Sequence, residues 1–314
     1  MTDIISDKLH SFRINVNNDF AKKEMGVKQK GTIIVRIWEG LGNQMFQYAY
    51  ARALKERGFD VRLDLNKAYD ETFSKNKKHD LRQNSIQEFN ITLMEINVEK
   101  YGKYQYIKRD NFKNRVIFWF AKHGLWKYKF YEAEEHQYSR KTVGIRGHYY
   151  VKGWFQDERY FKTIKKELRK ELTPKKKIRI SQELRKALEY EESVSVHVRR
   201  GDYVKVRHAL KMEYYRQAAA WIKGQYRNPK FLIFSDDLDW VKENLDIGNN
   251  CIYINEDRKF QDYEELMIMS RCKSNIISNS TFSWWGSWLN PNPKKIIVAP
   301  RNCWLPRQKN MILL

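Results

Sequence analysis

Cysteine, proline and long apolar runs are scarce in this chain of 314 residues, and each shortage excludes a class of protein. The three cysteines, Cys251, Cys272 and Cys303, are too few and too scattered for a disulfide framework or a zinc cluster. No run reaches the ~18 to 20 apolar residues that a membrane span requires. Residues 1–30 mix acids, amides and lysines without an apolar core, so we expect a weakly ordered extension there. Together these absences favour a cytoplasmic protein.

Acidic residues are also in short supply, and the formal net charge is +22. Residues 101–180 alone hold 22 Lys and Arg against 8 Asp and Glu. Such an excess suits nucleic acid, anionic lipid or a phosphorylated small molecule as a partner. Residues 116–131 interleave aromatic side chains with lysines, as segments on a membrane interface do, although a core helix with solvated lysines gives the same pattern. No nucleic-acid recognition motif accompanies the charge.

The first regular unit alternates strand, helix and strand. Residues 32–38 (TIIVRIW) predict a buried strand, residues 44–57 a helix, and residues 59–65 a second strand. A glycine-bearing turn joins the first two, and Asn43 is placed to cap the helix. This order is typical of a parallel α/β sheet. Residues 67–156 show no clear periodicity, so no elements are predicted there.

The C-terminal half alternates more regularly and predicts a doubly wound α/β domain. Its expected strands are 193–198, 231–234, 251–254, 275–278 and 295–299, and its expected helices are 212–223, 240–245, 261–271 and 282–289. A charged, helix-like stretch at 157–172, followed by Pro174, predicts the connection between the domains. We therefore expect an N-terminal α/β domain over 31–160 and a Rossmann-like domain over 161–314.

The motif HVRRGDY, residues 197–203, places Arg199 and Arg200 side by side where a buried strand ends. Ligands of open α/β sheets lie just beyond the carboxyl ends of strands. The planar guanidinium fork binds phosphate oxygens bidentately, so the pair predicts a diphosphate site, with Gly201 allowing a sharp turn. A solvated surface turn would carry the same short motif.

Two further segments carry polar groups at predicted strand ends. Ser280 and Thr281 lie at a strand-to-helix junction, where hydroxyls and free N–H groups bind anions or simply cap the helix. Asp237 and Asp239 form a D-x-D triplet that suits either a divalent ion or the first turn of a helix. His197 is either a buried core histidine or a hydrogen-bonding partner for a base.

Three segments together resemble glycosyltransferase family 11, the α-1,2-fucosyltransferases, in their bacterial form. They are GLGNQMFQYA at 40–49, HVRRGDY at 197–203 and NSTFSWWGSWL at 279–289, and the resemblance runs from Thr32 onward. It implies a two-domain, GT-B-like fold with Rossmann-like parallel sheets and an inverting transfer of L-fucose from GDP-β-L-fucose. The acceptor would be the galactose 2-hydroxyl of an oligosaccharide or lipid-linked glycan. No metal, other cofactor or nucleic acid is implied.

The resemblance also implies roles for individual residues. The residues expected to contact the donor are His197 and Glu265 at the guanine, Arg199 and Arg200 at the diphosphate, and Ser280, Thr281 and Phe282 at the phosphates. Asn43 would approach the fucose and diphosphate from the N-terminal domain, which forms the acceptor side of the cleft. Asp202 would hold an arginine in place. Glu265 stands where the family usually has Asp, which keeps the carboxylate and lengthens its reach.

The resemblance assigns the general base less directly than it assigns the donor contacts. Glu39 replaces the usual first glycine of GGLGNQ and would face the cleft, so it is the first choice, with Asp202 second. A solvent-facing loop residue is the alternative for Glu39. The basic excess would serve the donor or hold the enzyme against an anionic inner-membrane surface. The alternative function is a basic nucleic-acid-binding protein, or a nucleotide-sugar-binding protein without fucosyl transfer.

Overall fold

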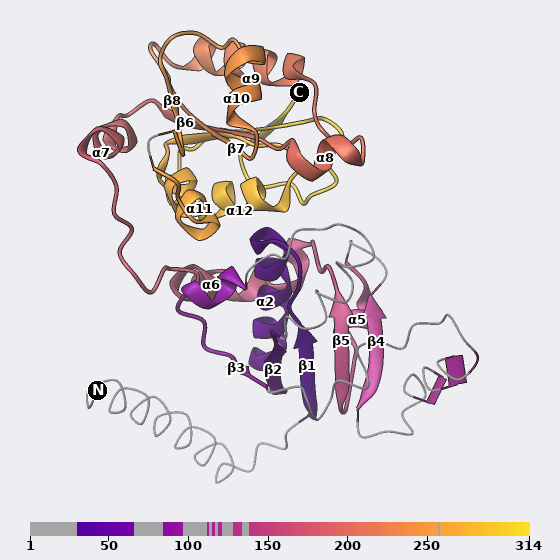
Figure 1. The fold of residues 1–314 in the computed structure, drawn as a ribbon. Helices are drawn as coiled ribbons and strands as arrows, with labels where there is room; N and C mark the ends of the chain where they lie inside the picture. The colour runs from indigo at the N-terminus through magenta and orange to yellow at the C-terminus, as the bar shows by residue number, and fades with distance from the viewer. Residues whose placement is uncertain are drawn as a thin grey trace.

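A computed structural model describes residues 30–65, 84–96, 112, 115–116, 119–120, 128–133, 138–256 and 258–314. Within these ranges the chain forms two α/β domains, drawn one above the other in Figure 1, each built on a parallel sheet. Residues 1–29 of the expected extension and most of the aromatic, lysine-rich segment 116–131 lie outside the described ranges. In the described part of the chain, no helix has both the length and the apolar character needed to cross a membrane.

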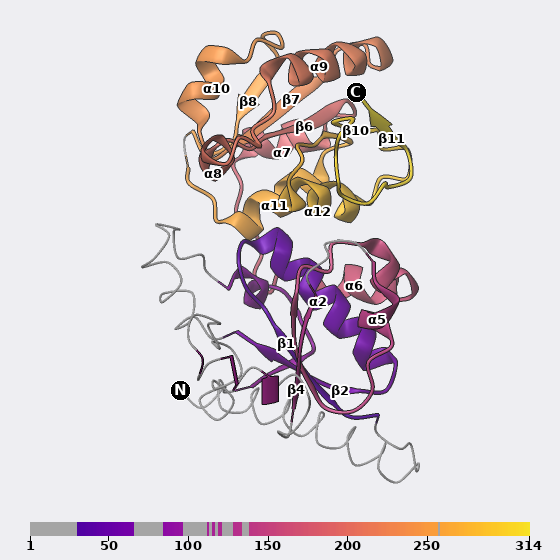
Figure 2. The ribbon, with the colours of Figure 1, turned by 90° about the vertical axis from the view of Figure 1, so that its right-hand side faces the viewer.

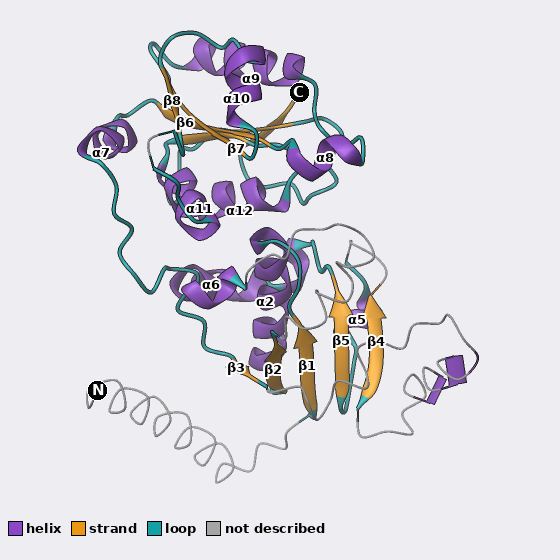
Figure 3. Ribbon diagram, viewed as in Figure 1, coloured by secondary structure: helices purple, strands orange, loops and turns teal. Residues whose placement is uncertain are grey.

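The N-terminal domain is a five-stranded parallel sheet in the order β3-β2-β1-β5-β4. The strands are β1 (Thr32–Arg36), β2 (Asp60–Asp64), β3 (Met94–Glu95), β4 (Lys129–Ala133) and β5 (Tyr149–Gly153). The helices are α2 (Leu41–Glu56), α5 (Arg140–Val143) and α6 (Lys165–Glu171), with 3₁₀ turns η1 (Ser85–Glu88), η4 (Glu158–Tyr160) and η5 (Lys162–Ile164). Figure 3 shows α2 beside the sheet, on the side that also carries α6.

Helix α2 is the central element of the molecule. Its side chains are buried on nearly all faces because the sheet, α6 and the C-terminal domain surround it. The helix starts earlier than the sequence indicated: Gly40 is the N-cap, and the Asn43 N–H already donates to the Gly40 carbonyl at 2.9 Å. The prediction that Asn43 caps the helix is therefore wrong, and its side chain is available for the cleft.

The C-terminal domain is a six-stranded parallel sheet in the order β11-β10-β9-β6-β7-β8. Its strands are β6 (Ser193–Val198), β7 (Lys230–Ser235), β8 (Cys251–Tyr253), β9 (Ser274–Ile276), β10 (Ile297–Ala299) and β11 (Met311–Leu313). Its helices are α7 (Gln182–Glu189), α8 (Gly201–Lys205), α9 (Met212–Gln225), α10 (Leu238–Asn244), α11 (Asp262–Arg271) and α12 (Thr281–Leu289). In Figures 1 and 2, α11 and α12 lie between this sheet and α2.

Most predicted elements are confirmed within a few residues, and the two-domain α/β architecture is confirmed. The stretch at 157–172 differs: it forms η4, η5 and α6 instead of one helix. Leu168 and Leu172 pack in the core that contains α2, so α6 lies on the N-terminal side. The chain crosses to the other domain between α6 and α7, beyond the boundary at residue 160 expected from the sequence. In the C-terminal domain, helices α7 and α8 and strand β11 were not predicted.

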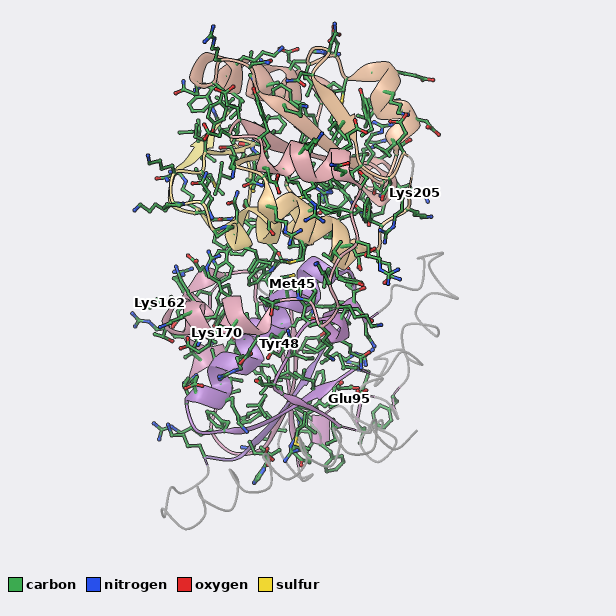
Figure 4. All side chains as sticks on the ribbon, turned by 90° about the vertical axis from the view of Figure 1, so that its left-hand side faces the viewer. Met45, Tyr48, Glu95, Lys162, Lys170 and Lys205 are labelled. Carbon is green, nitrogen blue, oxygen red and sulfur yellow. The ribbon has the colours of Figure 1, made fainter. Side chains whose placement is uncertain are left out.

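Aromatic packing joins the two domains. The Phe46 ring of α2 lies 4.8 Å from that of Trp284 and 5.0 Å from that of Trp285 in α12. Arg169 of α6 lies over the Trp288 ring, 4.4 Å from its centroid. Figure 4 shows Met45 at the end of α2 that faces the C-terminal domain. This buried contact holds the loops at the carboxyl ends of the two sheets opposite each other.

Candidate active site

A cavity of about 2450 Å³ lies between the two domains. It is lined by loops that follow β1 and β5 in one domain and β6, β7, β8 and β9 in the other. The carboxyl ends of both parallel sheets therefore open into one space, which is where ligands of such sheets bind. The lining is predominantly polar and charged on the side of β6 and β7.

Arg199 is fixed at the end of β6 by two carboxylates. Its Nη2 lies 2.6 Å from Asp202 Oδ1, and its Nη1 lies 2.8 Å from Asp236 Oδ2. The guanidinium also lies 5.5 Å from the Tyr203 ring centroid. These contacts orient the fork, while each terminal nitrogen keeps a second N–H for a ligand. The expected role of Asp202 as an anchor for an arginine agrees with this geometry.

Arg200 does not share this position. Its Nε lies 3.0 Å from Asp237 Oδ2, and its guanidinium carbon lies 3.2 Å from the Trp240 ring centroid. Arg200 is not among the residues that line the cavity. Of the two arginines expected at a diphosphate, only Arg199 lines the cavity, because the ion pair and the indole ring direct Arg200 towards α10.

Gly201 leaves room for the close approach of a carboxylate and does not adopt a positive φ angle. A Cβ at this position would lie 2.6 Å from Asp236 Oδ2. The same Asp236 accepts the Arg200 backbone N–H at 2.8 Å. Glycine therefore lets the carboxylate reach the backbone and hold Arg199.

Two helix N-termini meet at the wall of the cavity. Ser280 caps α12 and accepts the Phe282 N–H at 3.3 Å. A Cβ on Gly42, in the first turn of α2, would lie 2.5 Å from the Phe282 nitrogen and 2.6 Å from Thr281 Oγ1. The positive ends of both helix dipoles therefore lie at the cavity that Arg199 also lines, which makes this cavity suitable for an anion.

His197 and Glu265 give the site two groups with shifted pKa values. Burial, aided by the nearby Arg199 charge, lowers the pKa of His197 to about 3, so its ring is neutral at physiological pH. Its Nδ1 lies 3.1 Å from Ser278 Oγ. Burial raises the pKa of Glu265 to about 7, and Asn255 Nδ2 donates to Glu265 Oε1 at 2.6 Å. Both side chains line the cavity.

The N-terminal domain contributes the turn that follows β1. Glu39 has a φ of 66°, in the left-handed region that favours glycine. The Gln44 side chain donates to the Glu39 carbonyl at 2.6 Å and holds this conformation. Asn43 Oδ1 accepts from Gln156 Nε2 at 2.9 Å. Glu39 thus replaces the family's usual glycine at a position whose backbone conformation favours glycine.

The structure brings most of the predicted site residues to one cavity. Those that line it are Glu39, Asn43, His197, Arg199, Asp202, Glu265, Ser280, Thr281 and Phe282. Sequence reasoning missed Asp236 and Asn255. A signal for Asp236 existed, since it is the first acid after the buried strand FLIF and neighbouring parallel strands end at the same edge.

The D-x-D triplet is divided between two environments. Asp237 pairs with Arg200, whereas Asp239 lines the cavity. Across the described ranges, no group of three or more His, Cys, Asp or Glu residues is arranged to hold a metal ion. The three cysteines are unpaired, and Cys272 is buried.

Comparison with known proteins shows which family the sequence resembles. The profile described as Glycosyl transferase family 11 matches residues 32–310. An alpha-1,2-colitosyltransferase of Escherichia coli is 34% identical, with 88% of this chain and 93% of that protein covered. Galactoside alpha-(1,2)-fucosyltransferase 1 of Homo sapiens is 28% identical, covering 31% of this chain and 28% of that protein. Fucosyltransferase NodZ from Bradyrhizobium, a solved structure, is 15% identical, with 84% and 94% covered and a TM-score of 0.43. The chain belongs to glycosyl transferase family 11 and is a nucleotide-sugar glycosyltransferase.

Proposed function

We propose that this enzyme transfers L-fucose from GDP-β-L-fucose to the 2-hydroxyl of a galactose, with inversion. The observation that carries the proposal is that Arg199 and two helix N-termini, which are in close contact with each other, line the same cleft between the domains. Such a cleft suits a diphosphate. The matched relatives are an alpha-1,2-colitosyltransferase and a galactoside alpha-(1,2)-fucosyltransferase, which supports the linkage.

The reaction forms one bond and breaks another at the anomeric carbon. The acceptor oxygen attacks this carbon as the bond to the diphosphate oxygen breaks, and GDP leaves with the bonding electron pair. The acceptor proton passes to a base on the opposite side. Negative charge accumulates on the diphosphate, where Arg199 and the N-termini of α2 and α12 stabilise it. These groups supply the charge that a divalent ion would otherwise provide, so we propose a metal-independent transfer.

Glu39 is the carboxylate that we propose as the base. It lines the cavity from the domain opposite Arg199, whereas Asp202 is committed to the Arg199 ion pair. A non-glycine residue held at positive φ is a strained feature of the kind found at functional sites.

Glu39→Gln keeps the size of the side chain and removes its basicity. We expect kcat at saturating acceptor to fall about 100-fold, at the lower end of general-base effects. The KM for the donor should stay unchanged. A steady-state assay of GDP release measures both, and an unchanged kcat would eliminate Glu39 as the base.

Donor affinity should depend on pH through Glu265. An ionised carboxylate accepts the N1 and N2 protons of guanine, whereas the protonated form presents an O–H to these donors. Because the pKa of Glu265 is raised to about 7, the dissociation constant of GDP-fucose should rise as the pH falls below 7. The limiting slope for one proton is about tenfold per pH unit.

Calorimetry with GDP-fucose between pH 5.5 and 8 measures this dependence. GDP-fucose is preferred to GDP because its diphosphate has no ionisation near pH 6. Glu265→Gln is the matched variant, and it should bind weakly with little pH dependence. His197, with a pKa of about 3, does not titrate in this range. A flat profile for the unmodified protein would refute the assignment of Glu265 to guanine.

Colitose transfer is the second candidate, because the matched relative with 34% identity is an alpha-1,2-colitosyltransferase. One experiment separates the candidates: GDP release is followed with GDP-fucose or GDP-colitose, a panel of β-galactosides, and with or without a chelator. We expect chelator-resistant turnover that needs both GDP-fucose and a galactoside. A clear preference for GDP-colitose would contradict the fucose assignment. Salt-sensitive retention on nucleic acid without donor binding would favour the alternative function.

A further inference from the structure

The order of the strands in the C-terminal sheet defines two ends of the cavity, one on each side of β6. Asn255 and Glu265 lie at the side of β8 and α11, whereas Arg199 lies at the end of the central strand β6. On the other side of β6, Asn279 follows β9, and its side chain donates to the His208 carbonyl at 3.0 Å. The cavity therefore continues past Arg199, away from the guanine end. His208 and Trp304 line this continuation, with ring centroids 6.0 Å apart.

The strand order of the N-terminal sheet matches these two ends of the cavity. Its η1 turn lies at the guanine end, where Ser85 Oγ donates to Asp262 of α11 at 2.8 Å. That turn follows β2, which borders β1 on one side, and β5 borders β1 on the other. Trp154, which follows β5 directly, therefore lines the cavity away from the guanine end.

Trp154 is supported by a second indole. The rings of Trp38 and Trp154 have centroids 4.6 Å apart, and they follow the adjacent parallel strands β1 and β5. Lys152 Nζ lies 4.8 Å from the Trp38 ring centroid on this side of the sheet. Across the cavity, Trp304 is 43% exposed and Val206 is 53% exposed. Exposed apolar side chains that border a polar cavity are typical of a ligand-binding groove.

We propose that Trp154, supported by Trp38, and Trp304 form the acceptor-sugar subsite of the cleft. One face of a galactopyranose ring carries C–H groups and is apolar, while its rim carries hydroxyls. A flat indole binds that face and leaves the rim free for polar neighbours such as Gln156 and His208. This inference rests on the proposed galactoside acceptor and adds the residues that select it.

Trp154→Ala is the first test, read from the separate KM values of the two substrates. We expect the acceptor KM to rise roughly tenfold or more, as expected for truncating a large aromatic anchor. The donor KM should stay unchanged. Trp154→Phe should recover part of the acceptor affinity, and Trp304→Ala should also raise the acceptor KM. Thermal unfolding of each variant checks that it is folded.

Trp119→Ala is the matched control, because Trp119 is 53% exposed and does not line the cavity. It should leave both KM values unchanged. An unchanged acceptor KM in folded Trp154→Ala, or an equal rise in both KM values, would overturn the subsite. Binding of methyl β-galactoside, followed by saturation-transfer NMR with GDP present, is measured in parallel. If the unmodified protein transfers no fucose yet binds this galactoside through Trp154, the proposed reaction fails and the subsite stands.

Discussion

Replacement of Arg199 by lysine should lower kcat between about 100-fold and 1000-fold, the effect of losing a principal donor at a developing oxyanion. This corresponds to roughly 3 to 4 kcal/mol of barrier. Lysine keeps the positive charge but cannot reproduce the planar fork that Asp202 and Asp236 hold in place. GDP release at saturating substrates measures the loss.

Arg200→Lys is the matched control, because it makes the same change one residue away. Arg200 pairs with Asp237 and stacks on Trp240, outside the cavity lining. Its replacement should therefore lower thermal stability slightly and affect kcat far less than Arg199→Lys. Equal losses in the two variants would show that Arg200 also binds the diphosphate. Near-normal turnover by Arg199→Lys would contradict the role of Arg199.

Gly42→Ala should separate the two helix N-termini at the domain boundary. The added methyl would lie 2.5 Å from the Phe282 backbone nitrogen, and this backbone cannot yield as a flexible side chain does. Overpacking of this kind costs about 1 to 3 kcal/mol of unfolding free energy. The same displacement moves Asn43 and α12 apart, and misplacement by about 1 Å can reduce the rate about 100-fold. Denaturant unfolding and GDP release measure the two effects.

Gly224→Ala provides the control for this substitution. Gly224 lies in α9, and a Cβ there meets nothing within 4 Å. Alanine should therefore stabilise the helix by about 0.5 to 1 kcal/mol and leave turnover unchanged. If Gly42→Ala behaves like Gly224→Ala, the close approach of α2 and α12 does not organise the site.

The local sequence predicted most regular elements within 32–65 and 193–299, because hydrophobic periodicity and turn residues are encoded locally. The pairing that makes the site is not local. Val198 of β6 pairs with Ser235 of β7, so the next residues, Arg199 and Asp236, meet although they are far apart in the chain. The direction of Arg200 likewise depends on Trp240. The resemblance to the family identified residues at the site, but their contacts depend on strand order and packing.

The backbone conformation of Glu39 is a second feature that the local sequence could not predict. The sequence showed that Glu39 replaces a glycine, whereas the positive φ that makes this replacement unusual is visible only in the structure. The helix start at Leu41 also removes Asn43 from the capping role suggested by residue type. The Gln44 side chain bonds the Glu39 carbonyl within this turn, whereas the partner of the Asn43 side chain, Gln156, is distant in the sequence and could not be read from a local pattern.

The linkage and anomeric configuration of the product test the central claim most directly. The protein is incubated with GDP-β-L-fucose and methyl β-galactoside, and the purified product is analysed by two-dimensional NMR. We predict an α-L-fucosyl residue on the galactose 2-oxygen, which is the result of inversion at the anomeric carbon. A β-linked product, or attachment to a different hydroxyl, would contradict the account.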